Sequence, residues 1–193
     1  MDQTRHGIEE KARQGFDRAH AGEPREGTGR PSEIVYADRV EHWVEALVAE
    51  PSIALRLAAR AQHLERWAIP RSEYPEGRGG YLRWRSAVHA RQGERVRQIL
   101  ADAGADAGLT ERVAGLVAKR MPPADPEAQA LEDAACLVFL ETQLEDFSRK
   151  HARDKVVDVV RKTWRKMSPA GRQAAGTLAL PEGLPALVHE ATN

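Results

Sequence analysis

The chain is poor in cysteine, in aromatic residues and in net charge. Its 193 residues include one cysteine, and its 29 basic residues balance its 29 acidic ones. A single cysteine excludes a disulfide bond within the chain. Zero formal charge argues against a general polyanion binder, so nucleic acid is not expected as a general partner.

Long apolar runs are also missing. No stretch approaches the roughly 20 apolar residues that span a bilayer. The first residues, Met-Asp-Gln-Thr-Arg-His, lack the apolar core of a signal peptide. These absences predict a cytoplasmic protein that does not contact a membrane.

Helical periodicity, in contrast, extends along almost the whole sequence. Apolar residues recur at three- and four-residue spacing at about 4–19, 36–49, 51–67, 81–103, 109–120, 126–151 and 154–166, and a short helix is expected from Pro169. The sequence predicts an all-α, single-domain bundle of seven or eight helices. We expect residues 1–32 to form an N-terminal helix and a Gly/Pro-rich loop, residues 33–176 the main helical domain, and residues 177–193 a tail packed on the surface.

Side chains suited to chemistry are concentrated between Gln62 and His89. This segment contains two histidines, five arginines and four aromatic residues, namely His63, His89, Arg66, Arg71, Arg78, Arg83, Arg85, Trp67, Tyr74, Tyr81 and Trp84. Guanidinium groups suit phosphate oxygens, and aromatic rings can stack on a base or a sugar. The alternatives are surface salt bridges for each arginine alone and core packing for the rings.

Two histidines and one acid suggest a metal site. Asp133 stands at the head of the apolar run Ala134–Leu140, where a carboxylate needs a metal, a cation or several hydrogen-bond donors. An acid that serves the helix dipole or an arginine is the alternative. His63, His89 and Asp133 come from three predicted helices and suit one divalent zinc, manganese or iron ion. Cys136, in the same run, is expected to be a buried reduced thiol rather than a nucleophile.

Several long motifs resemble an uncharacterised family. They are the run from Ala59 to Pro75, Arg78-Gly-Gly-Tyr-Leu-Arg-Trp-Arg85, His89-Ala90, Leu131-Glu-Asp133-Ala-Ala-Cys-Leu-Val-Phe-Leu-Glu141, and Arg161-Lys-Thr-Trp-Arg-Lys-Met-Ser-Pro169. The resemblance is to the family of domain of unknown function 4202. Some members have been labelled glutamyl-tRNA synthetases, but this chain shows no nucleotide-binding α/β unit.

This family is in turn distantly similar to the HD superfamily of metal-dependent phosphohydrolases. Those all-α proteins bind metal through a histidine on one helix, a His-Asp pair on a following helix and a distal aspartate. By this resemblance His63 matches the first histidine, His89 the second and Asp133 the distal aspartate. Ala90 stands where the superfamily has the aspartate of its pair. The resemblance implies an HD-like fold with one metal ion rather than two.

Two functions follow as hypotheses. The first is a metal-dependent phosphohydrolase for a small phosphorylated molecule or nucleotide, in which a metal-activated water attacks phosphorus. Glu65 and Glu132 are its candidate catalytic bases, and its candidate substrate-binding residues are Arg66, Arg71, Tyr74, Arg78, Tyr81, Arg83, Trp84, Arg85 and Lys119. The second is a degenerate HD-like module that binds an anionic ligand or partner without efficient catalysis, which Ala90 favours. The oligomeric state stays open.

Overall fold

The computed structural model describes residues 2–24 and 30–192 and confirms an all-α, single-domain protein, because every regular element in those ranges is a helix. The described residues form ten α-helices rather than seven or eight. They are α1 (Asp2–Ala21), α2 (Ser32–Leu47), α3 (Ile53–Arg60), α4 (Gly77–Ala103), α5 (Ala107–Val117), α6 (Pro126–Val138), α7 (Leu144–Lys150), α8 (Arg153–Lys166), α9 (Pro169–Ala175) and α10 (Leu184–Thr192). None of these helices is both long and apolar enough to cross a membrane.

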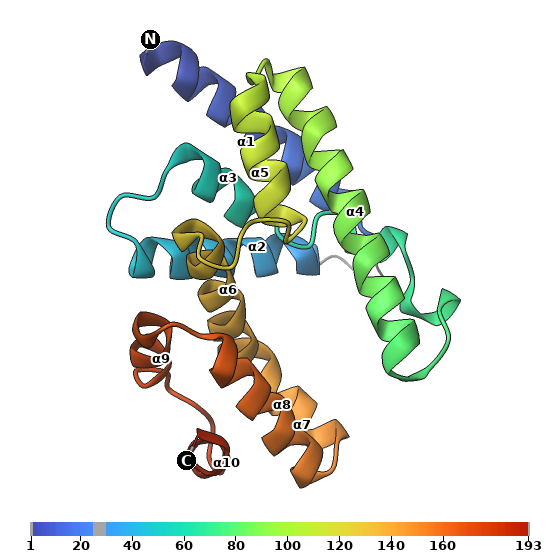
Figure 1. Cartoon of the computed structure of the whole chain (residues 1–193), viewed down its shortest axis with the longest axis vertical. Coiled ribbons are helices and arrows are strands. Elements are labelled where there is room, and N and C mark those ends of the chain that lie inside the picture. Colours follow the sequence, from blue (N-terminus) through green and yellow to red (C-terminus); the bar gives the residue numbers. More distant parts are fainter. Residues whose placement is uncertain (1, 25–29, 193) are drawn as a thin grey trace.

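α6 lies at the middle of the fold (Figure 1) and packs against α2, α8 and α9. α4, with 27 residues, packs against α1 and α5. α10 packs against α8, and the start of α1 and α10 lie at opposite ends of the molecule. Helices from both halves of the sequence therefore meet around α6.

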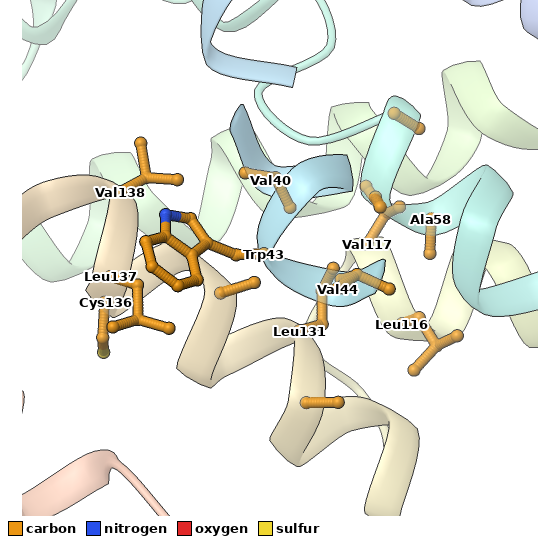
Figure 2. Packing of buried hydrophobic residues seen from close by; sticks show 14 of the residues in the cluster. Val40, Trp43, Val44, Ala58, Leu116, Val117, Leu131, Cys136, Leu137 and Val138 are labelled. Atoms are coloured by element: carbon orange, nitrogen blue, oxygen red, sulfur yellow. The ribbon is translucent and has the colours of Figure 1, made fainter. Parts of the chain in front are cut away.

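The core between α2 and α6 fixes two helices that later form walls of the candidate site. Figure 2 shows Trp43 and Val44 of α2 packed with Leu131 and Leu137 of α6. Both leucines are completely buried, and burying such a side chain contributes about 2 kcal/mol. Trp43 Nε1 also donates a hydrogen bond to Glu141 Oε2 at 3.1 Å. The relative position of the two helices is thus set by packing.

Several helix boundaries differ from the prediction, including those of α3, α4 and α6. α3 ends at Arg60 instead of continuing to about 67, because His63 adopts a left-handed backbone that an α-helix cannot include. α4 begins at Gly77 rather than at about 81. The predicted helix at about 126–151 is divided into α6 and α7 by a π-helical turn, Phe139–Gln143. The first and third of these differences reshape the candidate site.

The segment predicted as a surface tail contains α10. This helix buries Leu184, Leu187 and Ala191. The prolines and the glycine at 181–185 favour a surface tail, but the three buried residues have the i, i+3, i+7 spacing of a helix face. Packing of α10 on α8 therefore anchors the C-terminal segment.

Candidate anion-binding site

A partly open cavity of about 260 Å³, here termed the basic pocket, is lined by several helices. Its walls come from α2, the turn after α3, α4, the end of α5, α6 with the following π-helical turn, and the end of α8. The volume lies slightly below the roughly 300–1,000 Å³ of pockets for drug-sized ligands. The basic pocket therefore suits a smaller molecule.

The basic pocket contains eight of the fourteen residues predicted for the site. These are His63, Arg66, Tyr81, Trp84, Arg85, His89, Lys119 and Glu132. The six that do not line it are Glu65, Arg71, Tyr74, Arg78, Arg83 and Asp133. The dense segment of the sequence thus indicates the region of the site, but the fold decides which of its residues take part.

Positive charge dominates the lining of the basic pocket. Arg66, Arg85, Lys119 and Lys166 line it together with one carboxylate, Glu132. Lys119 Nζ lies 2.9 Å from one oxygen of Glu132, and Lys166 Nζ lies 3.5 Å from the other. In the described ranges, neither Arg66 nor Arg85 forms an ion pair with an acid. Two guanidinium groups are therefore left for an anion.

Trp84 holds Arg66 at the wall of the basic pocket. The guanidinium carbon of Arg66 lies 4.9 Å from the centre of the Trp84 ring, within the range of a cation–π contact. Trp84 is buried, and its Nε1 donates to the Ile69 carbonyl at 2.8 Å. Tyr81 is 44% exposed, with its ring centre 5.8 Å from that of Trp84. Trp84 thus belongs to the framework, whereas Tyr81 is accessible to a ligand.

The carboxyl group of Glu132 is strongly acidic. Burial raises its pKa, but the charges of Lys119, Lys166 and Arg85 outweigh burial and lower the pKa to about 2. A general base works best when its pKa lies near the working pH. Glu132 therefore fits the role of a counter-ion to the lysines better than that of a catalytic base.

Both histidines of the basic pocket are mainly uncharged near neutral pH. Burial, followed by the charge of Arg85, lowers the pKa of His89 to about 4. Burial also lowers the pKa of His63, although Glu33 opposes the shift. Arg66 donates to His63 Nε2 at 2.9 Å, and His63 Nδ1 lies 3.2 Å from Glu33. Both ring nitrogens of His63 are therefore engaged by protein groups.

Three non-glycine residues in the described ranges have a left-handed backbone, and two of them line the basic pocket. The φ angles are 60° at His63, 47° at Glu65 and 56° at Lys119. Such a conformation costs about 1–3 kcal/mol at a residue with a side chain and concentrates at functional sites. The strain at His63 and Lys119 thus supports a functional role for the pocket.

Lys119 occupies the position after α5 at which glycine is usual. Its N–H donates to the Leu116 carbonyl at 3.3 Å, and the N–H of Arg120 donates to the Gly115 carbonyl at 2.9 Å. This pair of hydrogen bonds is the Schellman motif, which favours glycine at the left-handed residue. The lysine side chain is therefore retained at a cost to the backbone.

The π-helical turn after α6 is a second backbone irregularity at the pocket. Its first and last residues, Phe139 and Gln143, both line the cavity. π-helical turns are rare within helices and occur frequently at functional sites. The predicted continuous helix would have presented other side chains to the cavity.

Gln92 contributes a buried hydrogen-bond donor to the lining. Its side chain is on α4, the residue is 4% exposed, and its amide nitrogen has no hydrogen-bond partner among the described residues. Leaving such a group unsatisfied costs about 1–3 kcal/mol. A ligand oxygen in the basic pocket would recover part of that free energy.

Asp133, one of the three predicted metal ligands, is directed at the start of α9 instead. Its carboxylate accepts hydrogen bonds from the Ser168 N–H at 2.8 Å, from Ser168 Oγ at 2.5 Å and from Gln129 Nε2 at 3.0 Å. Ser168 is the N-cap of α9, and its Oγ also accepts from the Gly171 N–H. Several neutral donors therefore satisfy the buried carboxylate.

The predicted divalent ion does not fit this arrangement. His63 and His89 line the basic pocket without Asp133, and the ring nitrogens of His63 are engaged. Within residues 2–24 and 30–192, no three histidine, cysteine, aspartate or glutamate side chains are grouped so that they could hold a metal ion. The surrounding arginines and lysines also disfavour a cation.

The other predicted residues outside the pocket have different roles. Glu65 forms ion pairs with Arg91 at 2.9 Å and Arg95 at 2.8 Å, so its carboxylate is tied to α4. Arg71 donates to the carbonyls of Tyr74 and Pro75 and stabilises the turn before α4. Arg78 and Arg83 are exposed.

Cys136 borders the basic pocket but is 5% exposed. Burial, supported by Glu132, raises the pKa of its thiol to about 12. A nucleophilic cysteine needs a lowered pKa. The expectation of a buried reduced thiol therefore agrees with its surroundings.

Sequence reasoning missed several lining residues. Gln92 is one turn of helix after His89 and shares a face of α4 with Arg85, so helical spacing was a signal that could have found it. Tyr36 and Lys166 reach the basic pocket from α2 and α8. No local pattern connects those two residues with the segment at 62–89.

A protein-family model described as a domain of unknown function, DUF4202, matches residues 10–188. The chain belongs to this family. Searches of curated proteins and of solved structures found no match. The resemblance to DUF4202 is thus confirmed, while the comparisons add no support for the distant relation to the HD superfamily, which stays a prediction. The pocket of this DUF4202 domain has to be interpreted from its own geometry.

Proposed function

We propose that this DUF4202 domain binds a small anionic molecule, with phosphate as the favoured anionic group, in the basic pocket. The excess of cationic side chains supports this most directly, because neither Arg66 nor Arg85 forms an ion pair with an acid among the described residues. A guanidinium group can bind two phosphate oxygens at once. Partial enclosure strengthens such contacts because water screens them less.

Binding without metal-dependent catalysis accounts best for the titrating groups. Glu132 has a pKa of about 2 and His89 a pKa of about 4. Neither value is near the neutral range that suits general acid–base catalysis. In the terms of the HD resemblance, this is the degenerate module, in which Ala90 replaces a metal-binding aspartate.

The proposal is tested by titrating the protein calorimetrically with inorganic phosphate and a panel of small phosphorylated metabolites. Arg85→Ala should lower the affinity of a bound compound about tenfold or more, since a charge-assisted hydrogen bond contributes about 1.5–3 kcal/mol. Arg83→Ala is the matched control, because Arg83 is on the same helix but exposed and outside the pocket. Its affinity should stay within about twofold of the unmodified protein.

Two results would contradict the proposal. One is the absence of binding by any compound, or an equal loss in the Arg85→Ala and Arg83→Ala variants. The other is one equivalent of a transition metal in protein purified without a histidine tag, lost in His89→Ala, together with metal-dependent phosphatase turnover. The second result would restore the phosphohydrolase hypothesis.

A further inference from the structure

A second hollow, of about 380 Å³ and here termed the outer groove, lies between α4 and the end of α5. It shares Arg85, His89 and Lys119 with the basic pocket. Leu82 and Arg120 line the outer groove only. The same three side chains therefore border two adjoining spaces.

The outer groove is lined by cations without an acid. Arg85, Lys119 and Arg120 line it, and its lining includes no carboxylate. Arg120 forms no ion pair in the part of the chain that the structure describes. Glu111, whose charge interacts with Arg120, forms its ion pair with Arg97 at 2.7 Å. The outer groove thus adds positive charge without a directly paired acid beside the basic pocket.

The two spaces together carry more positive charge than one phosphate can neutralise. Five cationic side chains line them, namely Arg66, Arg85, Lys119, Arg120 and Lys166, against the single carboxylate of Glu132. One phosphate group carries a charge of about −1.5 to −2 at neutral pH. A second anionic group on the same ligand would balance more of the remainder.

Two further features favour a ligand-binding role for this region. Gln92 offers a buried and unpartnered amide nitrogen inside the basic pocket. Lys119, at the junction of the two spaces, keeps a strained left-handed backbone where glycine would relieve the strain. Gln92 would contact the inner part of the ligand, and Lys119 lies where its two anionic groups would be joined.

We propose that the ligand carries at least two anionic groups, one in the basic pocket and one over the outer groove. A small molecule with a linear diphosphate or triphosphate, or with two phosphates on a short linker, has this chemistry. This inference rests on the proposed function, because it names the class of ligand for the same site. Arg120 then determines specificity for the second group and has no part in binding the first.

The test compares calorimetric affinities for inorganic phosphate, pyrophosphate and tripolyphosphate at about 0.15 M ionic strength, where screening acts over about 8 Å. Affinity should rise at least about tenfold from phosphate to tripolyphosphate. Arg120→Ala should remove most of that gain and leave phosphate binding within about twofold, whereas Arg85→Ala weakens all three probes. Arg83→Ala is the control for loss of an exposed arginine, and unchanged thermal unfolding shows that the variants remain folded.

The outcomes separate this inference from the proposed function. If phosphate binds in an Arg85-dependent way but the longer probes bind no more tightly, or Arg120→Ala weakens all probes equally, only the inference is overturned. If none of the three probes binds, the inference is overturned, and the proposed function fails as well only when the phosphorylated metabolites also do not bind. If a short single-stranded oligonucleotide binds more tightly than tripolyphosphate, the proposal that the ligand is a small molecule is overturned.

Discussion

Two neighbouring acids on α6, Glu132 and Asp133, have opposite surroundings. Glu132 borders the basic pocket and is the counter-ion of Lys119 and Lys166. Asp133 is 3% exposed and accepts hydrogen bonds from Ser168 at the start of α9. Consecutive residues of an α-helix are directed about 100° apart. One side of α6 therefore presents a charge to the ligand space, and another joins two helices.

The comparison shows that burial of an acid does not by itself indicate a metal site. A buried carboxylate needs partners, and donors at the start of a helix can supply them together with the positive end of the helix dipole. The less buried Glu132 lies among cations that would also meet an anionic ligand. The candidate binding site is thus on the Glu132 side of α6, although Asp133 was the more conspicuous acid in the sequence.

Removal of the Asp133 carboxylate, which contacts the start of α9, should have the largest effect on stability. Asp133→Ala is expected to lower the free energy of unfolding by about 3 kcal/mol, since it leaves both partly buried donors of Ser168 without their acceptor. Chemical denaturation measures the change. Glu132→Ala, at the adjacent position, should cost less, about 1 kcal/mol, because its ion pairs with the two lysines are partly exposed. Equal losses of stability in the two variants would contradict the different roles of Asp133 and Glu132.

Crowding the same contact should have a smaller effect. A Cβ atom at Gly171 would lie 2.6 Å from Asp133 Cγ, so Gly171→Ala has to displace the carboxylate or α9. We expect a loss of about 2 kcal/mol in chemical denaturation. Gly7→Ala in α1 is the control, because nothing lies within 4 Å of the added atom. The Gly7→Ala variant should be as stable as the unmodified protein or more stable. If Gly171→Ala is equally stable, the close contact between Gly171 and Asp133 is contradicted.

On the pocket side, the strain at Lys119 can be measured directly. Lys119→Gly and Lys119→Ala both remove the partner of Glu132 and differ only in how well the new residue tolerates a φ of 56°. Lys119→Gly should be about 1 kcal/mol more stable in chemical denaturation. Equal stability of the two variants would show that the backbone is not strained at this position.

The neutral state of His89 predicts a pH effect. Its pKa is about 4 in the folded protein, against about 6.5 in an unfolded chain. Between these values the unfolded chain binds more protons, so the free energy of unfolding falls as the pH falls from about 6.5 toward 4. Denaturation at several pH values should show a smaller loss in His89→Gln than in the unmodified protein. If stability depends on pH identically in the two proteins, the pKa of His89 is not lowered by burial.

The smallest expected effect concerns the charge of Glu132 itself. Glu132→Gln removes the one carboxylate of the basic pocket and with it the repulsion between that carboxylate and a bound phosphate. Affinity for inorganic phosphate should rise only about threefold, because solvent partly screens this repulsion. Calorimetric titration measures it. Asp133→Asn is the comparison, because Asp133 does not line the pocket. A fall in affinity in Glu132→Gln would mean that Glu132 holds the lysines in their binding positions.

The position of the site could be predicted from sequence only as a region. Arg83 and Arg85 are two residues apart on α4, yet one is exposed and the other lines the basic pocket. Both residues are basic, so helical periodicity alone did not reveal which of them faces inward. Lys166 was missed because it arrives from α8, at a distance in sequence that no local pattern connects.

The all-helical fold and the gathering of basic and aromatic side chains at 62–89 can be recognised in the amino-acid sequence, because helical periodicity and composition are local properties. In contrast, the packing of the helices sets the direction of two neighbouring acids, with Glu132 facing the basic pocket and Asp133 facing α9. The hydrogen bonds between Asp133 and Ser168 join residues 35 positions apart and depend on how α9 packs against α6. Partners of that kind are chosen by packing of whole helices and not by the residues on either side of them.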